Sequence, residues 1–204
     1  LKALKNTSLL RMNAGVFALH LIMTANFLVV PTLFTQELGL PTLDHWKIYL
    51  PVFLVAFLGS IPLIIVAEKR HKIKPMLLAA IALLVIAEIL LALGYAEKNS
   101  LLIAFALFFL GFNFLEAIQP ALVAKYSAVE TKGTAMGIYN STQFLGIFVG
   151  GILGGWVNQQ WQAAGVFWLS ALVAGAWLVT TLKLPAPTFY TSRVVRFTGA
   201  VSNW

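Results

Sequence analysis

Charged residues and cysteine are both scarce in this sequence. Asp, Glu, Lys and Arg make up 10% of the 204 residues, and there is no cysteine. The absence of cysteine excludes disulfide bonds, a thiolate metal site and a cysteine nucleophile. The low charge argues against a soluble domain, because a soluble domain of this size must cover its exterior with polar groups.

Long apolar stretches take up most of the chain. Hydrophobic residues account for 60% of it, and the mean hydropathy is +0.87. A helix that spans a bilayer needs about 20 mostly apolar residues. We therefore expect an all-α integral membrane protein, with one six-helix bundle over residues 1–184 and a cytoplasmic tail over residues 185–204. The predicted transmembrane helices are residues 12–36, 48–67, 75–95, 101–124, 135–157 and 164–182.

The basic residues are distributed unevenly between the two sides of this predicted bundle. Net charge is +7, and Lys47 and Lys98 are the two basic residues on one side. The other side holds twelve, namely Lys2, Lys5, Arg11, Lys69, Arg70, Lys72, Lys74, Lys125, Lys132, Lys183, Arg193 and Arg196. Cytoplasmic loops carry an excess of Lys and Arg, so both termini are predicted to be cytoplasmic in a multi-pass protein of the cell membrane. Because the positive charges lie in loops between apolar runs, we expect membrane lipid as the surroundings and no nucleic-acid partner.

Three ionisable side chains lie inside the predicted helices: His20, Glu88 and Glu116. Burying such a group in a bilayer costs several kcal/mol, which makes each one a functional candidate. At about 1.5 Å rise per residue, His20 and Glu116 each lie about 12 Å from a cytoplasmic helix end, whereas Glu88 lies about 20 Å deep. His20 and Glu116 can therefore meet at one level and exchange a proton near neutral pH. Glu88 is a secondary candidate, because no partner is expected at its depth.

Uncharged polar side chains surround this predicted proton pair. They are Asn26, Asn113, Gln119, Tyr139, Asn140 and Gln143. Such groups either line a substrate cavity or form hydrogen bonds between packed helices, and the sequence leaves both interpretations open. The glycines Gly146, Gly150 and Gly154 recur every four residues, a spacing that favours close helix packing over a ligand contact.

Sequence signatures of enzymes are missing. There is no His-Glu-x-x-His zinc motif, no Gly-x-Ser-x-Gly nucleophile elbow and no phosphate-binding loop. We therefore do not expect an enzyme, a metal site or a cofactor.

Several segments together resemble the C-terminal half of YajR-like transporters of the major facilitator superfamily, a branch grouped with drug:proton antiporters. These segments are residues 45–50 (HWKIYL), 87–89 (AEI), 112–117 (FNFLEA), 130–137 (ETKGTAMG) and 143–146 (QFLG). The resemblance covers roughly residues 5–185. It implies helices seven to twelve of a twelve-helix protein, arranged as two inverted three-helix repeats. It also implies that His20 and Glu116 line the central cavity, and that Glu88 lies on a peripheral helix.

Two features depart from that family pattern. Residues 68–74 occupy the place of a Gly-x3-Asp-Arg-x-Gly-Arg-Lys loop, but Glu68-Lys69 replaces Asp-Arg and His71 replaces the second glycine. We expect this loop to make charge contacts between helices. The N-terminal six-helix half and the soluble domain that follows the last helix in YajR-like proteins are both absent, so we expect a truncated product or a split transporter.

The leading hypothesis is the C-terminal half of a proton-coupled efflux antiporter in the inner membrane. Glu116 and His20 would carry the proton, an unidentified small molecule would be the substrate, and the N-terminal six-helix half would be the partner. The alternatives are a non-transporting membrane remnant, the partner-binding half of a split transporter, and a six-helix channel. A channel is disfavoured by the lack of a charged ring or a re-entrant filter segment.

Overall fold

A computed structural model of the chain describes residues 6–185, and in this part of the chain helices joined by short turns are the regular structure, with no strand. Its elements are α2 (Thr7–Gln36), η1 (Thr42–Asp44), α3 (Trp46–Lys69), α4 (Ile73–Gly94), α5 (Lys98–Tyr126), η2 (Val129–Thr131) and α6 (Lys132–Leu182). The predicted all-α fold is confirmed. The predicted tail falls outside the described residues except for Pro185.

Polar side chains at the helix starts explain where two of the long helices begin. The Asn6 side chain accepts hydrogen bonds from the backbone N–H groups of Ser8 and Leu9, at 2.9 and 3.4 Å. Glu97 caps α5 in the same way through Asn99 and Ser100. These bonds satisfy N–H groups that have no partner within the helix. Both α2 and α5 therefore start earlier than the apolar stretches alone predict.

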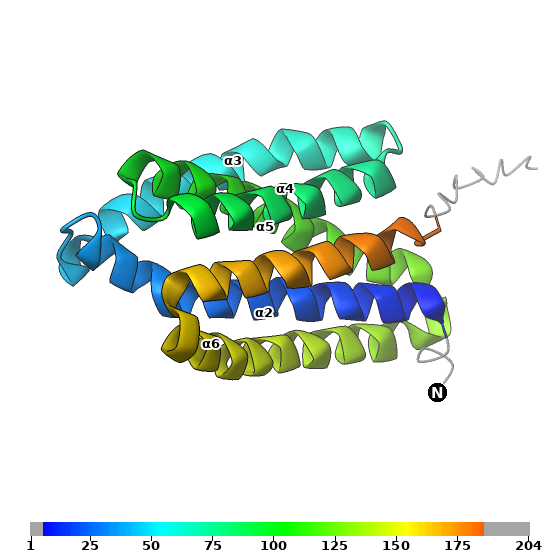
Figure 1. Ribbon diagram of the computed structural model, residues 1–204. Helices are drawn as coiled ribbons and strands as arrows, with labels where there is room; N and C mark the ends of the chain where they lie inside the picture. The colour runs from blue at the N-terminus through cyan, green and yellow to red at the C-terminus, as the bar shows by residue number, and fades with distance from the viewer. Residues whose placement is uncertain (1–5, 186–204) are drawn as a thin grey trace, which may run out of the picture.

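The longest element, α6, is bent into two arms at Gln162. This residue has φ 56° and ψ −162°, which are not helical angles, and the chain reverses there, so that α2 lies between the two arms in the view of Figure 1. The sequence predicts two helices joined by a turn over residues 158–163. In the structure the two arms meet directly at Gln162, whose non-helical backbone angles mark the point where the chain reverses. A residue other than glycine in this region carries local backbone strain.

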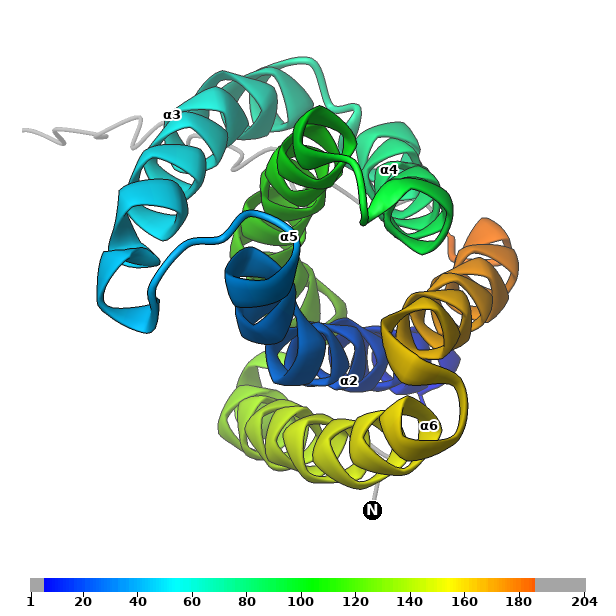
Figure 2. The same ribbon diagram turned by 60° about the vertical axis from the view of Figure 1, so that its left-hand side comes forward.

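Helix α2 packs most extensively against α6 (Figure 2). A Cβ atom added to Gly146 or Gly150 would lie 2.5 Å from the backbone oxygen of Phe17 or Leu21. One added to Gly154 would lie 2.8 Å from the Cα atom of Ala25. The predicted role of this glycine series in close helix packing is therefore confirmed.

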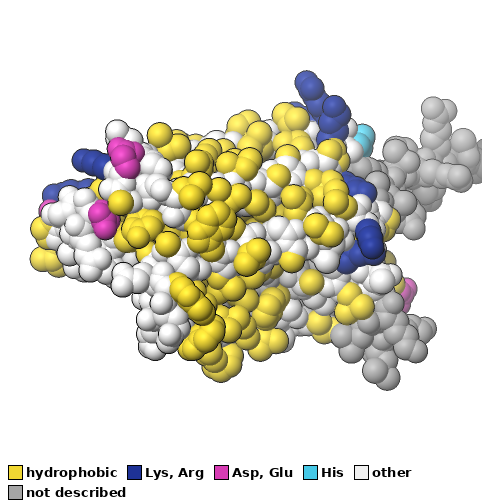
Figure 3. Space-filling view, in the orientation of Figure 1, with side chains coloured by type: hydrophobic (Ala, Val, Ile, Leu, Met, Phe, Trp, Pro, Cys, Tyr) yellow, Lys and Arg dark blue, Asp and Glu magenta, His cyan; other side chains and the backbone are white. Residues whose placement is uncertain are grey.

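The surface of the bundle separates charge from apolar side chains. Charged side chains gather at the two ends of the long axis, and hydrophobic side chains cover the middle (Figure 3). Among residues 6–185, five helices are long and apolar enough to cross a membrane. At one end Lys125 Nζ lies 3.6 Å from Glu68 Oε1, which joins α5 to α3. The expected charge contact from the 68–74 loop is thus present.

Candidate proton site and family membership

His20 lies on the face of α2 that meets α5 and the first arm of α6, and it is 3% exposed. Its Nδ1 atom is 3.1 Å from the backbone oxygen of Val16, one turn earlier. A carbonyl oxygen only accepts hydrogen bonds, so Nδ1 carries the hydrogen. The Nε2 atom is then free to accept a proton or to donate one, depending on the charge of the ring.

Two side chains from different helices approach this Nε2 atom. Gln143 Nε2, on α6, lies 2.8 Å away, and Glu116 Oε2, on α5, lies 3.6 Å away. An amide nitrogen only donates, so in this arrangement the neutral ring accepts a hydrogen bond from Gln143. The Glu116 distance allows an ion pair but is too long for a direct hydrogen bond. The sequence-based prediction that His20 and Glu116 meet is confirmed in geometry.

The environment of Glu116 is partly open. Its side chain is 38% exposed, while its Oε2 atom is buried and has no hydrogen-bond partner within residues 6–185. One turn earlier on α5, the Phe112 ring meets the His20 ring edge-on at a centroid distance of 6.0 Å. The pair therefore has an apolar wall around His20 and an approach for small ions or solutes at Glu116.

The six predicted cavity residues divide into two groups. Asn140 is exposed, Asn113 and Gln143 are half-buried, and Gln143 contacts His20. Gln119, Tyr139 and Asn26 are each at most 2% exposed, so in this arrangement they are interior groups. Gln119 lies beside Gly15, because a Cβ atom built on that glycine would be 2.8 Å from both Gln119 Oε1 and Trp177 Nε1.

Glu88 has a partner, and the expectation that it has none is wrong. Asn26 Nδ2 on α2 donates to Glu88 Oε1 on α4 at 2.6 Å. Ser170, on the second arm of α6, donates to Asn26 Oδ1 at 3.3 Å. By the same measure Asn26 and Glu88 each lie about 20 Å from a cytoplasmic helix end, but depth alone does not tell which faces of α2 and α4 meet. Ser170 was not predicted at all, although it is a polar residue in an otherwise apolar stretch.

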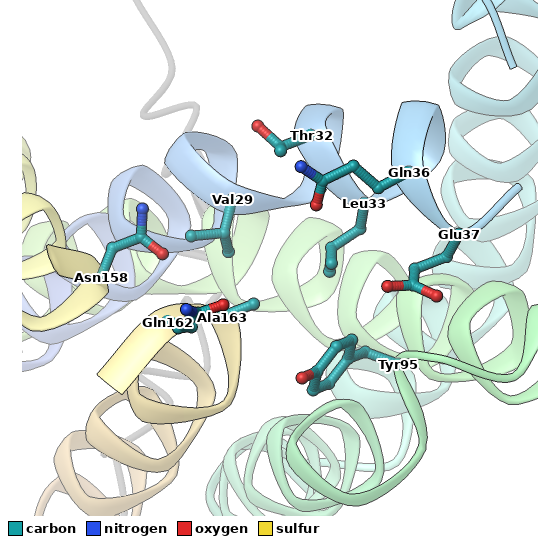
Figure 4. A pocket seen from close by; sticks show the side chains of 9 residues that line it. All are labelled: Val29, Thr32, Leu33, Gln36, Glu37, Tyr95, Asn158, Gln162 and Ala163. Atoms are coloured by element: carbon teal, nitrogen blue, oxygen red, sulfur yellow. The ribbon is translucent and has the colours of Figure 1, made fainter. Parts of the chain in front are cut away.

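A separate cavity of about 240 Å³ lies near the bend of α6. It is lined by Val29, Thr32, Leu33, Gln36, Glu37, Tyr95, Asn158, Gln162 and Ala163 (Figure 4). None of these residues belongs to the His20 cluster, so the cavity is not part of the candidate proton site.

Comparison with known proteins identifies the family of this helical bundle. Residues 12–201 match the Major Facilitator Superfamily. The chain belongs to the major facilitator superfamily. The sequence-based resemblance to its YajR-like members is confirmed, because the chain is 38% identical over 191 residues to the inner membrane transport protein YajR of Escherichia coli K12. That alignment covers 94% of this chain and 42% of YajR.

Two other relatives align at lower identity. An uncharacterized transporter of Buchnera aphidicola (subspecies Baizongia pistaciae) is 30% identical, over 89% of this chain and 46% of that protein. The multidrug resistance protein MdtH of Aeromonas salmonicida is 29% identical, over 80% of this chain and 41% of its own length. The chain thus spans less than half the length of each of these relatives.

Proposed function

We propose that this chain is the C-terminal half of a proton-coupled secondary transporter of the inner membrane, which exports a small amphipathic molecule. The observation that carries the proposal is the convergence of His20, Glu116 and Gln143 inside an apolar helical bundle. Membership of the superfamily supports transport as the activity. The similarity to YajR, an inner membrane transport protein, supports the location, and the similarity to MdtH, a multidrug resistance protein, supports export. The missing partner in this proposal is an N-terminal six-helix half.

In the proposed topology the two arms of α6 are separate spans, which gives six spans in two inverted three-helix repeats. The bend at Gln162 supports this count, because it reverses the chain between two apolar segments. The twelve-to-two distribution of basic residues supports cytoplasmic termini. In such a fold a substrate site lies between the two halves, near the middle of the membrane.

The proposed proton cycle follows from the hydrogen bonds of His20. With the ring neutral and Glu116 ionised, the pair carries one negative charge, and Gln143 Nε2 donates to the ring. One added proton makes the pair neutral overall, either as a carboxylic acid beside imidazole or as a carboxylate beside imidazolium. A net charge is costly to enclose in an apolar cavity. Protonation therefore favours the closed cavity, and loss of the proton favours one open to solvent.

An efflux assay with Glu116→Gln tests this proposal. Cells that produce the complete natural protein are loaded with ethidium or with neutral amphipathic dyes, and efflux is followed with and without a protonophore. We expect the wild-type protein to show protonophore-sensitive efflux, and the Glu116→Gln variant to lose it at equal abundance in the membrane, because glutamine cannot release a proton.

Glu37→Gln is the matched control, because it removes a carboxylate from an exposed site at the end of α2 and should leave efflux unchanged. Unchanged protonophore-sensitive efflux in the Glu116→Gln variant would contradict the proposed role of Glu116. A wild-type protein that moves none of the dyes would contradict export.

A further inference from the structure

Glu88 is a fully buried carboxyl group, and it lies outside the His20 cluster. Its exposed fraction is 0%, and its single hydrogen-bond partner within residues 6–185 is Asn26, which donates to Oε1. The second oxygen, Oε2, is buried and has no partner in the described chain. An ionised carboxylate offers about four acceptor sites, so a single donor leaves most of these sites without a hydrogen bond. A carboxylic acid needs fewer donors and fits this arrangement better.

No cation faces Glu88 from the helices packed around it. Residues 133–182 contain no Asp, Glu, Lys or Arg, so the packing surface of α6 is uncharged. On α2, His20 is the one titratable residue between Met12 and Gln36, and its partners are Val16, Gln143 and Glu116. On α4 beyond Lys74, Glu88 is itself the one charged residue. On α5, Glu116 is the one titratable residue between Lys98 and Lys125, and it is paired with His20.

The neighbours of Glu88 connect three helices. Asn26 lies on α2 and is 1% exposed, and Ser170 lies on the second arm of α6 and is 0% exposed. Asn26 uses its nitrogen on Glu88 and its oxygen on Ser170, so a single amide bridges α4 and α6. His20 and Asn26 are six residues apart on α2, so they point in directions about 120° apart around its axis. The Glu88 cluster and the His20 cluster thus occupy different faces of one helix.

We propose that Glu88 binds a proton that stays in the folded protein, and that this neutral carboxylic acid joins Asn26 and Ser170 in a link between α2, α4 and the second arm of α6. The link holds α4 and the second arm of α6 against α2. Its proton is structural and is not transported. The inference requires only that the bundle is embedded in a membrane, so it does not depend on the proposed transport activity.

Infrared spectroscopy on the complete natural protein, purified in detergent, tests the protonation state directly. We expect a carbonyl band from a protonated carboxylic acid at neutral pH, which persists to alkaline pH and disappears in the Glu88→Gln variant. The Glu116→Gln variant should retain this band. A wild-type spectrum in which Glu88 contributes only carboxylate bands at neutral pH would overturn the proposal.

Stability and transport measurements test the structural role. Glu88→Gln keeps the acceptor for Asn26 and carries no charge, so its thermal unfolding midpoint and its pH profile of dye efflux should match the wild type. Glu88→Ala and Ser170→Ala should each lower the midpoint by several degrees. An altered efflux pH profile in a stable Glu88→Gln variant would mean that the proton moves, which contradicts the proposal. If wild-type efflux itself is absent, the infrared band still decides the question.

Discussion

At the scale of single residues, the Gln143 amide can both donate and accept a hydrogen bond, which suits a neighbour such as His20 whose charge changes. Its nitrogen now donates to the neutral His20 ring at 2.8 Å. A half-turn of the amide would place the oxygen there, where it can accept from a protonated ring. The Gln143 side chain can therefore form a hydrogen bond with both the neutral and the protonated His20 ring, which an apolar packing residue cannot do.

Replacing Gln143 with leucine should slow coupled transport by about tenfold, because loss of one buried hydrogen bond costs about 1.4 kcal/mol. The pH profile of dye efflux should also shift, since His20 loses a partner in both of its charge states. Gln159→Leu is a matched control at an exposed position of α6. An unchanged rate and pH profile in the Gln143→Leu variant would show that the amide only fills space.

The sequence predicted these residues unevenly. The residue types and the depths of His20 and Glu116 were sufficient to predict their encounter, because both lie at similar depth from the same side. Depth alone did not predict the Asn26–Glu88 contact, although both residues lie about 20 Å from a cytoplasmic helix end, because it does not tell which faces of α2 and α4 meet. Likewise, no local signal marks Gln162 as the bend, since glutamine has no preference for positive φ.

At the scale of elements, the interface between α2 and α6 depends on the absence of side chains. Three glycines spaced by four residues bring the α6 backbone against that of α2. In a membrane, close packing of this kind replaces the hydrophobic driving force that operates in water. The spacing alone was sufficient to predict the packing, but it did not identify α2 as the partner.

Gly150→Ala should destabilise the bundle by about 1–3 kcal/mol, the usual cost of overpacking. The added methyl group would lie 2.5 Å from the Leu21 carbonyl oxygen, and a backbone atom cannot move aside as a side chain can. Gly155→Ala is the matched control, because nothing lies within 4 Å of its added methyl group. Chemical denaturation in detergent would compare the two variants, and equal stability would contradict a tight interface.

At the scale of the whole molecule, the apolar belt and the charged ends agree with a bundle that crosses the membrane (Figure 3). Composition and hydropathy were sufficient to predict an all-helical protein with long apolar helices. The orientation of the termini remains a prediction from the charge distribution. These 204 residues contain no cysteine, so a thiol introduced here is unique within this part of the protein and can report the orientation.

A single cysteine at Ala96, between α4 and α5, should react with a membrane-impermeant maleimide in intact cells. A single cysteine at Lys72, between α3 and α4, should react only after the membrane is permeabilised. Both positions are exposed in the structure, so a difference in labelling reports the side of the membrane. The reverse labelling pattern would place the termini on the outer side and contradict the proposed topology.

Proton movement in liposomes that contain the complete purified protein would test whether Glu116 carries the coupled proton, as we propose. A pH-sensitive dye inside the vesicles reports protons while an exported dye is supplied on one side. Dye transport by the wild-type protein should move protons in the opposite direction, and the Glu116→Gln variant should move none. Equal proton movement in the variant would show that Glu116 does not carry the coupled proton.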